Sequence, residues 1–166
     1  MSGDVRTNYP RRLRTFEYVG CYRYFLTFCT HKRFHAFTDV DAVNLTWSHF
    51  LRAADANGFA ISACCFMPDH THLVAEGESD ESDMKRFVTA AKQSSGYYYR
   101  QSFGRPLWQR YGYDHVLRGD ESTRQVVAYV LENPVRARLV EAIDQYPHFR
   151  SSRYDREELI EFAYGS

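Results

Sequence analysis

The sequence predicts a single α+β domain in which helices pack on an antiparallel sheet. Three observations support this prediction: the length of the chain, the spacing of its apolar residues, and the order of the segments that they define. The chain has 166 residues, of which 44 % are hydrophobic and 25 % charged, as is typical of one globular domain. No apolar run approaches the roughly 18 residues that span a bilayer, and the N-terminus lacks the apolar core of a signal peptide. We therefore expect a cytoplasmic protein without membrane association.

The first half of the chain predicts a strand, a helix and a hairpin of two strands. The aromatic-rich segment 22–30 is typical of a strand. Apolar residues then recur at helical spacing over 39–57, between an aspartate that can cap a helix and a glycine that can end one. The continuous apolar run 59–67 and the segment 70–76 flank a Pro-Asp turn, so we expect them to form the hairpin.

The second half of the chain completes the fold. The spacing predicts a helix over 84–99, a strand over 111–118 and a further helix that begins at 119–120. That helix should end near Asn133, because proline disfavours helical geometry at the residue before it. The order β-α-β-β-α-β followed by a helix is that of the ferredoxin-like split βαβ fold, an antiparallel sheet with helices on one face. Residues 155–163 predict one short surface helix.

The charge of the chain is zero only as a sum of unlike segments. Residues 1–38 contain seven basic and two acidic residues, and residues 84–118 contain seven and one, so their net charges are +5 and +6. Local field matters more than net charge in attracting a polyanion, so nucleic acid is a possible partner. We expect a basic N-terminal arm over 1–15, the main domain over 16–150 and a C-terminal tail over 151–166.

His70 and His72 are the first candidate functional residues. Side chains alternate along a strand, so the two imidazoles should point to the same face, beside a turn. Two converging imidazoles can chelate a divalent metal through ring nitrogens. The alternative is that both are ordinary surface histidines.

Tyr129 and Asn133 form the second candidate pair. Residues four apart on a helix lie about 40° apart around its axis, so both should lie on one face, at the edge of the apolar arc. With the histidines, an Asn133 amide oxygen would complete a three-ligand site for Mg²⁺ or Mn²⁺, and Tyr129 could attack a phosphorus atom nearby. The alternative is a tyrosine half-packed on the sheet and an asparagine that caps the helix C-terminus.

Three motifs resemble one known family. The segment 67–73 (MPDHTHL) is similar to the His-hydrophobic-His signature of the HUH tyrosine transposases. The segments 107–110 (LWQR) and 113–118 (YDHVLR), and then 129–140 (YVLENPVRARLV), resemble the REP-associated tyrosine transposase branch. The resemblance extends over 18–147, most of the chain.

This resemblance implies a ferredoxin-like fold and a metal-dependent endonuclease and transposase that acts on single-stranded or hairpin DNA. His70, His72 and Asn133 would be metal ligands, and Tyr129 would form a 5′-phosphotyrosine that allows the DNA to be rejoined. Thr71 stands where the family usually has an apolar residue, and we expect this to affect packing rather than catalysis. A monomer and a homodimer are both compatible with the resemblance.

Further residues are candidates for DNA contact. The alternatives are that the N-terminal arginines belong to a disordered arm, that the basic residues of 84–100 form a solvated helix face, and that the remaining candidates serve ordinary packing. His115 is included because its expected strand could bring it close to the metal or the phosphate. The candidates are Arg11, Arg12, Arg14, Lys85, Arg86, Lys92, Arg100, Trp108, Gln109 and His115. Two other functions are open: a domesticated protein that binds single-stranded or hairpin DNA without cleavage, and a metal-dependent hydrolase of small phosphoesters.

Overall fold

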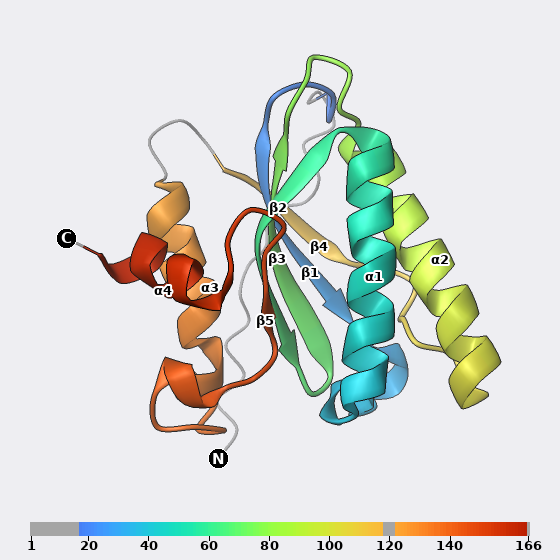
Figure 1. The fold of residues 1–166 in the computed structure, drawn as a ribbon. Coiled ribbons are helices and arrows are strands. Elements are labelled where there is room, and N and C mark those ends of the chain that lie inside the picture. Colours follow the sequence, from blue (N-terminus) through green and yellow to red (C-terminus); the bar gives the residue numbers. More distant parts are fainter. Residues whose placement is uncertain (1–16, 118–121, 166) are drawn as a thin grey trace.

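The computed structural model describes residues 17–117 and 122–165, and shows one sheet with helices on both faces (Figure 1). The predicted basic arm, with Arg11, Arg12 and Arg14, lies outside these residues. No described helix is long and apolar enough to cross a membrane.

The sheet is antiparallel, and its strands run in the spatial order β4-β1-β3-β2-β5. The first four strands have the order of the ferredoxin-like fold, so the predicted fold class is confirmed. The fifth strand, only two residues long, was not predicted. The strands are β1 (Arg23–Cys29), β2 (Phe59–Met67), β3 (His70–Gly77), β4 (Tyr113–Leu117) and β5 (Phe149–Arg150).

One face of the sheet is covered by α1 (Val40–Asn57) and α2 (Met84–Phe103), which lie side by side in Figure 1. The side chain of Asp39 accepts a hydrogen bond from the first turn of α1, as the sequence predicts. Helix α1 ends at Gly58 and α2 at Gly104, both with positive φ, which glycine adopts without strain. Helix α2 therefore continues one turn beyond the predicted end at residue 99.

The other face is covered by α3 (Thr123–Arg136) and α4 (Arg156–Tyr164), so the prediction of helices on one face holds only for α1 and α2 (Figure 1). The predicted start of α3 at 119–120 lies outside the described residues, and the described helix begins at Thr123. The side chain of Ser122 accepts a hydrogen bond from the backbone of Gln125, so Ser122 is the N-cap.

The predicted end of α3 near Asn133 is wrong, because the helix continues through Pro134 to Arg136. A proline removes one N–H donor and crowds the carbonyl one turn earlier. Pro134 is buried in the last turn of the helix. The carbonyl of Asn133 still accepts a hydrogen bond from Ala137. Short 3-10 helices complete the chain at His31–Arg33 (η1), Ala36–Thr38 (η2) and Ile143–Gln145 (η3).

Candidate active site

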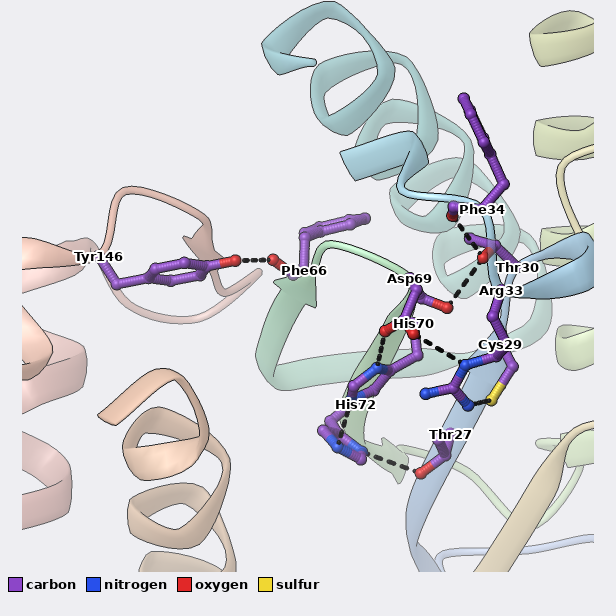
Figure 2. A network of polar contacts seen from close by, with 10 residues as sticks. All are labelled: Thr27, Cys29, Thr30, Arg33, Phe34, Phe66, Asp69, His70, His72 and Tyr146. Carbon is purple, nitrogen blue, oxygen red and sulfur yellow. Dashed lines mark hydrogen bonds and ion pairs between the residues drawn. The ribbon is translucent and has the colours of Figure 1, made fainter. Parts of the chain in front are cut away.

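The predicted histidine pair lies at the start of β3, next to the turn from β2 (Figure 2). In the β1–β3 register His72 is opposite Thr27, and on the other side it pairs with Cys65 of β2. Cys65 belongs to the buried cluster that packs under α3 and α4. Because side chains alternate along a strand, His70 and His72 both face the side of the sheet that α3 covers.

The two imidazoles converge through equivalent nitrogens. The Nε2 atoms of His70 and His72 are 3.2 Å apart, and the ring planes are nearly perpendicular at 79°. His72 is only 8 % exposed. Two nitrogens thus meet at a partly buried point, which confirms the geometric prediction that the pair shares one face.

The Nδ1 atom of each imidazole, which points away from the other ring, has a protein partner. Nδ1 of His72 lies 2.9 Å from the Thr27 hydroxyl, and Nδ1 of His70 lies 2.7 Å from a carboxylate oxygen of Asp69. A carboxylate only accepts hydrogen bonds, so it favours the His70 tautomer that carries its proton on Nδ1. That tautomer leaves the Nε2 lone pair available to a ligand.

Burial lowers the pKa of His72, whereas hydrogen bonds and nearby charges lower the pKa of Asp69. Burial, followed by the charges of His70, Arg136 and Arg33, lowers the pKa of His72 to about 3. Burial alone would raise the pKa of Asp69, but hydrogen bonds from His70 and Arg33 and their charges lower it to about 2. A neutral imidazole is the form that binds a metal.

Arg33 extends this network to the end of β1. Its Nε donates to the second carboxylate oxygen of Asp69 at 2.9 Å, and its Nη1 lies 2.9 Å from Sγ of Cys29. Figure 2 shows the resulting chain of contacts, from the Cys29 thiol to the Thr27 hydroxyl, with the histidines between them.

Tyr129, on α3, is connected to the histidines through one aromatic ring. The Phe25 ring stacks on His72 with centroids 5.2 Å apart and meets the Tyr129 ring edge-on at 6.1 Å. Tyr129 is 50 % exposed, so its ring is anchored on one side and accessible on the other. The Arg136 guanidinium lies 3.9 Å from the centroid of the Tyr129 ring and donates to its backbone carbonyl at 2.8 Å.

Asn133 lies one helical turn after Tyr129 and is partly buried. Its Nδ2 atom is buried and has no hydrogen-bond partner among the described residues. Buried polar atoms in proteins nearly always have a partner, so an external group or ion could satisfy this amide. A rotation of the amide by 180° would place Oδ1 at the buried position.

Among the described residues, no group of three or more His, Cys, Asp or Glu side chains is arranged to hold a metal. Asp69 uses both carboxylate oxygens on His70 and Arg33. A metal bound by the two imidazoles would therefore need a further ligand of another kind, such as the amide oxygen of Asn133.

The candidate DNA contacts on α2 lie on the opposite face of the sheet from Tyr129. Lys85, Arg86 and Arg100 are exposed there. Lys92 is half-buried, donates to the Gln109 backbone carbonyl at 3.1 Å and lies over the Phe28 ring. Lys92 therefore stabilises the fold whether or not it also contacts DNA.

The other candidates for DNA contact differ in how firmly they are packed. The indole of Trp108 packs among Phe28, Phe37 and Phe50, and its Nε1 donates to Ser95. These contacts support the packing alternative for Trp108. The Gln109 side chain donates to the Tyr111 carbonyl. His115 pairs with Phe25 in the β1–β4 register, and its side chain lies outside the description.

Four residues of this site were not predicted from the sequence: Thr27, Arg33, Asp69 and Arg136. Arg136 could have been found, because it lies seven residues after Tyr129 and so on nearly the same side of the helix. Thr27 and Arg33 could not, because only the pairing of β1 with β3 brings them to the histidines.

The sequence matches a family of known proteins. Residues 18–133 match the family described as "Transposase IS200 like". A protein named "Putative REP-associated tyrosine transposase", from Haemophilus influenzae, is 24 % identical over 156 residues, which cover 86 % of each chain.

Solved structures support the fold. A REP-associated tyrosine transposase bound to a REP hairpin superposes with a TM-score of 0.74 at 18 % identity, covering 94 % of this chain and 92 % of that one. A bacterial tRNA(His) guanylyltransferase-like protein in complex with GTP reaches 0.51 at 13 % identity, covering 92 % and 93 %. Because the same fold supports different chemistries, function has to be argued from the site. The family match and the predicted resemblance to REP-associated tyrosine transposases agree, and the chain belongs to the IS200-like transposase family.

Proposed function

We propose that this protein nicks and rejoins single-stranded DNA through a covalent bond to Tyr129, with Mg²⁺ or Mn²⁺ bound by His70, His72 and Asn133. The main support is the convergence of the two Nε2 atoms on the face that α3 covers, with both Nδ1 atoms engaged by protein. The solved relative in complex with a REP hairpin supports a hairpin as the substrate.

The histidine geometry fits a divalent cation. Two ligands that each lie about 2.1 Å from one ion, at the right angle of octahedral coordination, are about 3.0 Å apart. The observed separation of 3.2 Å is close to this value. The amide of Asn133 offers an oxygen, the ligand type that Mg²⁺ and Mn²⁺ prefer. When bound, the cation supplies Lewis-acid polarisation of a phosphoryl oxygen.

The half-exposed Tyr129 provides the nucleophile. Its Oη forms a bond to phosphorus while the bond from phosphorus to the 3′ oxygen breaks. The phenol proton passes to solvent, and the departing 3′ oxygen takes up a proton. The products are a 5′-phosphotyrosine and a free 3′-hydroxyl, and the reverse reaction rejoins the strand without ATP. Arg136 limits the orientation of the Tyr129 ring and adds a positive charge beside the reacting phosphate.

The test is formation of a covalent adduct. Wild-type protein, incubated with a hairpin oligonucleotide and Mn²⁺, should give a protein–DNA species that survives denaturing electrophoresis. Tyr129→Phe should bind the same hairpin and give no adduct. The matched control is Tyr98→Phe, because Tyr98 is also a helical tyrosine that is 50 % exposed, but on the opposite face of the sheet. An adduct formed by Tyr129→Phe would exclude Tyr129 as the nucleophile.

One observation favours a second function, which is hairpin binding without cleavage. The described residues provide two imidazoles but no acidic third ligand, so a weak metal site would leave a DNA-binding fold without chemistry. A folded wild-type protein that binds the hairpin yet forms no adduct in either Mg²⁺ or Mn²⁺ would support this function.

A further inference from the structure

The two histidines are anchored by different chemistry. His72 contacts the hydroxyl of Thr27, whereas His70 contacts the carboxylate of Asp69. The two oxygens of Asp69 have separate partners, at 2.7 Å in His70 and 2.9 Å in Arg33. The carboxylate therefore cannot rotate without losing one of these contacts. Turning towards a metal would likewise cost the carboxylate one of these contacts.

The backbone that presents Arg33 is strained. Lys32 and Arg33 have φ values of 52° and 56°, in the left-handed region that non-glycine residues seldom adopt. Such strain persists only where surrounding contacts enforce it, and it is concentrated at functional sites. Here Thr30 supplies the contacts. Its backbone N–H and its hydroxyl both donate to the Asp69 carbonyl, and the hydroxyl also lies 2.7 Å from the Phe34 carbonyl. The corner after β1 is thus joined to the β2–β3 turn.

From these contacts we infer that Asp69 and Arg33 are positioning residues for the metal site, an inference that rests on the proposed function. Asp69 accepts a hydrogen bond from the Nδ1–H of His70, which leaves the Nε2 lone pair directed towards His72 and increases its strength as a ligand. Arg33 fixes the carboxylate in the orientation that does so. Neither residue touches the metal or the DNA in this role.

A purely structural role is the competing explanation, since the pair also joins β1 to the β2–β3 turn. The same strand offers a matched pair for comparison. Arg153 and Glu76 form an ion pair at 3.0 Å at the far end of β3, away from both histidines. If the Arg33–Asp69 and Arg153–Glu76 pairs serve only to stabilise the fold, loss of either pair should have similar consequences for metal binding.

The experiment measures the His70 tautomer by ¹⁵N NMR of the metal-free protein and the affinity for Mn²⁺ by titration. The wild type should show the Nδ1-protonated form, and Asp69→Ala should show a mixture of tautomers. Loss of such a partner typically weakens metal binding by about 10–100-fold, and we expect a loss of this size for Asp69→Ala. Asp69→Asn keeps an oxygen that can accept a hydrogen bond from Nδ1 of His70, so its affinity for Mn²⁺ should lie between those of Asp69→Ala and the wild type. Arg33→Ala should cause a smaller loss than Asp69→Ala.

Glu76→Ala and Arg153→Ala should leave both the tautomer and the Mn²⁺ affinity unchanged. A wild-type tautomer in Asp69→Ala, or equal losses of affinity in the Arg33→Ala and Arg153→Ala variants, would overturn the positioning role. Failure of the wild type to bind Mn²⁺ would instead overturn the proposed metal function. The NMR measurement needs no metal, so it decides the positioning role in either case.

Discussion

The two faces of the sheet differ in the size of the side chains that they bury. Under α1 and α2 the core is rich in large aromatic rings, including Phe28, Phe50, Phe66 and Phe87. Under α3 and α4 it consists mainly of smaller residues. The proposed site lies on the second face, where Phe25 packs between His72 and the Tyr129 ring of α3.

A single tripeptide on β3 takes part in both faces. His70 and His72 point towards α3, whereas Thr71 pairs with Phe28 and Phe66 and points into the aromatic core. The same sheet separates Tyr129 from Lys85 and Arg86 of α2. One nucleotide therefore cannot contact both places, and any role of α2 in DNA binding has to concern a distant part of the substrate.

The largest expected effect comes from replacing His72 with alanine. The change removes one of two imidazole ligands, so cleavage of a hairpin should fall by about 10³-fold, equal to about 4 kcal/mol of transition-state stabilisation. Single-turnover cleavage in Mn²⁺ measures this loss, and Mn²⁺ titration should show a parallel loss of affinity.

His49→Ala is the matched control on the other face. His49 is also 8 % exposed, and it stacks on Tyr98 and contacts the Ser94 hydroxyl at 2.7 Å. Its loss should lower the free energy of unfolding by about 1–3 kcal/mol and leave single-turnover cleavage unchanged at temperatures where the variant is folded. If His49→Ala lost as much cleavage activity as His72→Ala, the placement of the cleavage site on the α3 face alone would be wrong.

A smaller effect, of opposite sign, is expected from Thr71→Val. The Thr71 hydroxyl is buried and has no hydrogen-bond partner among the described residues. Valine has the same shape and no polar atom to desolvate, so the free energy of unfolding should rise by about 1 kcal/mol. Urea denaturation at equilibrium measures the change.

Thr27→Val tests the same replacement on the face of the histidines. Thr27 is also buried, but its hydroxyl contacts Nδ1 of His72. Removing one partner leaves the other unsatisfied at a cost of about 1–3 kcal/mol, so this variant should be less stable than wild type. If Thr71→Val and Thr27→Val changed the free energy of unfolding equally, the contact of the Thr27 hydroxyl with His72 would add no stability.

The sequence predicts most of this fold because the patterns involved are local. Helix caps and the apolar run of β2 locate α1 and β2 to within a residue or two. The end of α3 was mispredicted because the preference of a residue before proline is weaker than the burial of Pro134. Strand β5 was missed because two residues show no alternation.

The candidate site divides in the same way. Alternation along β3 and spacing along α3, together with the resemblance to the HUH transposases, indicate His70, His72, Tyr129 and Asn133 as candidates without any tertiary information. The contacts of Asp69 with His70 and Arg33 depend on how the corner after β1 meets the β2–β3 turn. No local sequence pattern specifies how the corner after β1 packs against the β2–β3 turn, so the residues that orient the site could be identified only from the structure.

The smallest expected effect concerns the contact between α3 and α4. The hydroxyl of Tyr164 lies 3.0 Å from the Glu132 carboxylate and 3.3 Å from the Ala128 carbonyl. Burial, together with the hydrogen bond to Glu132 and its charge, raises the pKa of Tyr164 to about 12 from an ordinary value of 10.0. The protonated phenol is therefore favoured in the folded state.

The sign of the pH dependence follows from this shift. Below pH 10.0 the contact contributes its full stability, and as the pH rises towards about 12 the unfolded chain loses the phenolic proton first, so stability falls. Because Tyr164 is 43 % exposed, solvent screening should limit the loss to about a few tenths of a kcal/mol. Tyr164→Phe removes this term, so the difference in unfolding free energy between wild type and variant should shrink as the pH rises. A difference that stays constant across this range would mean that the protonation of Tyr164 has no part in holding α4 against α3.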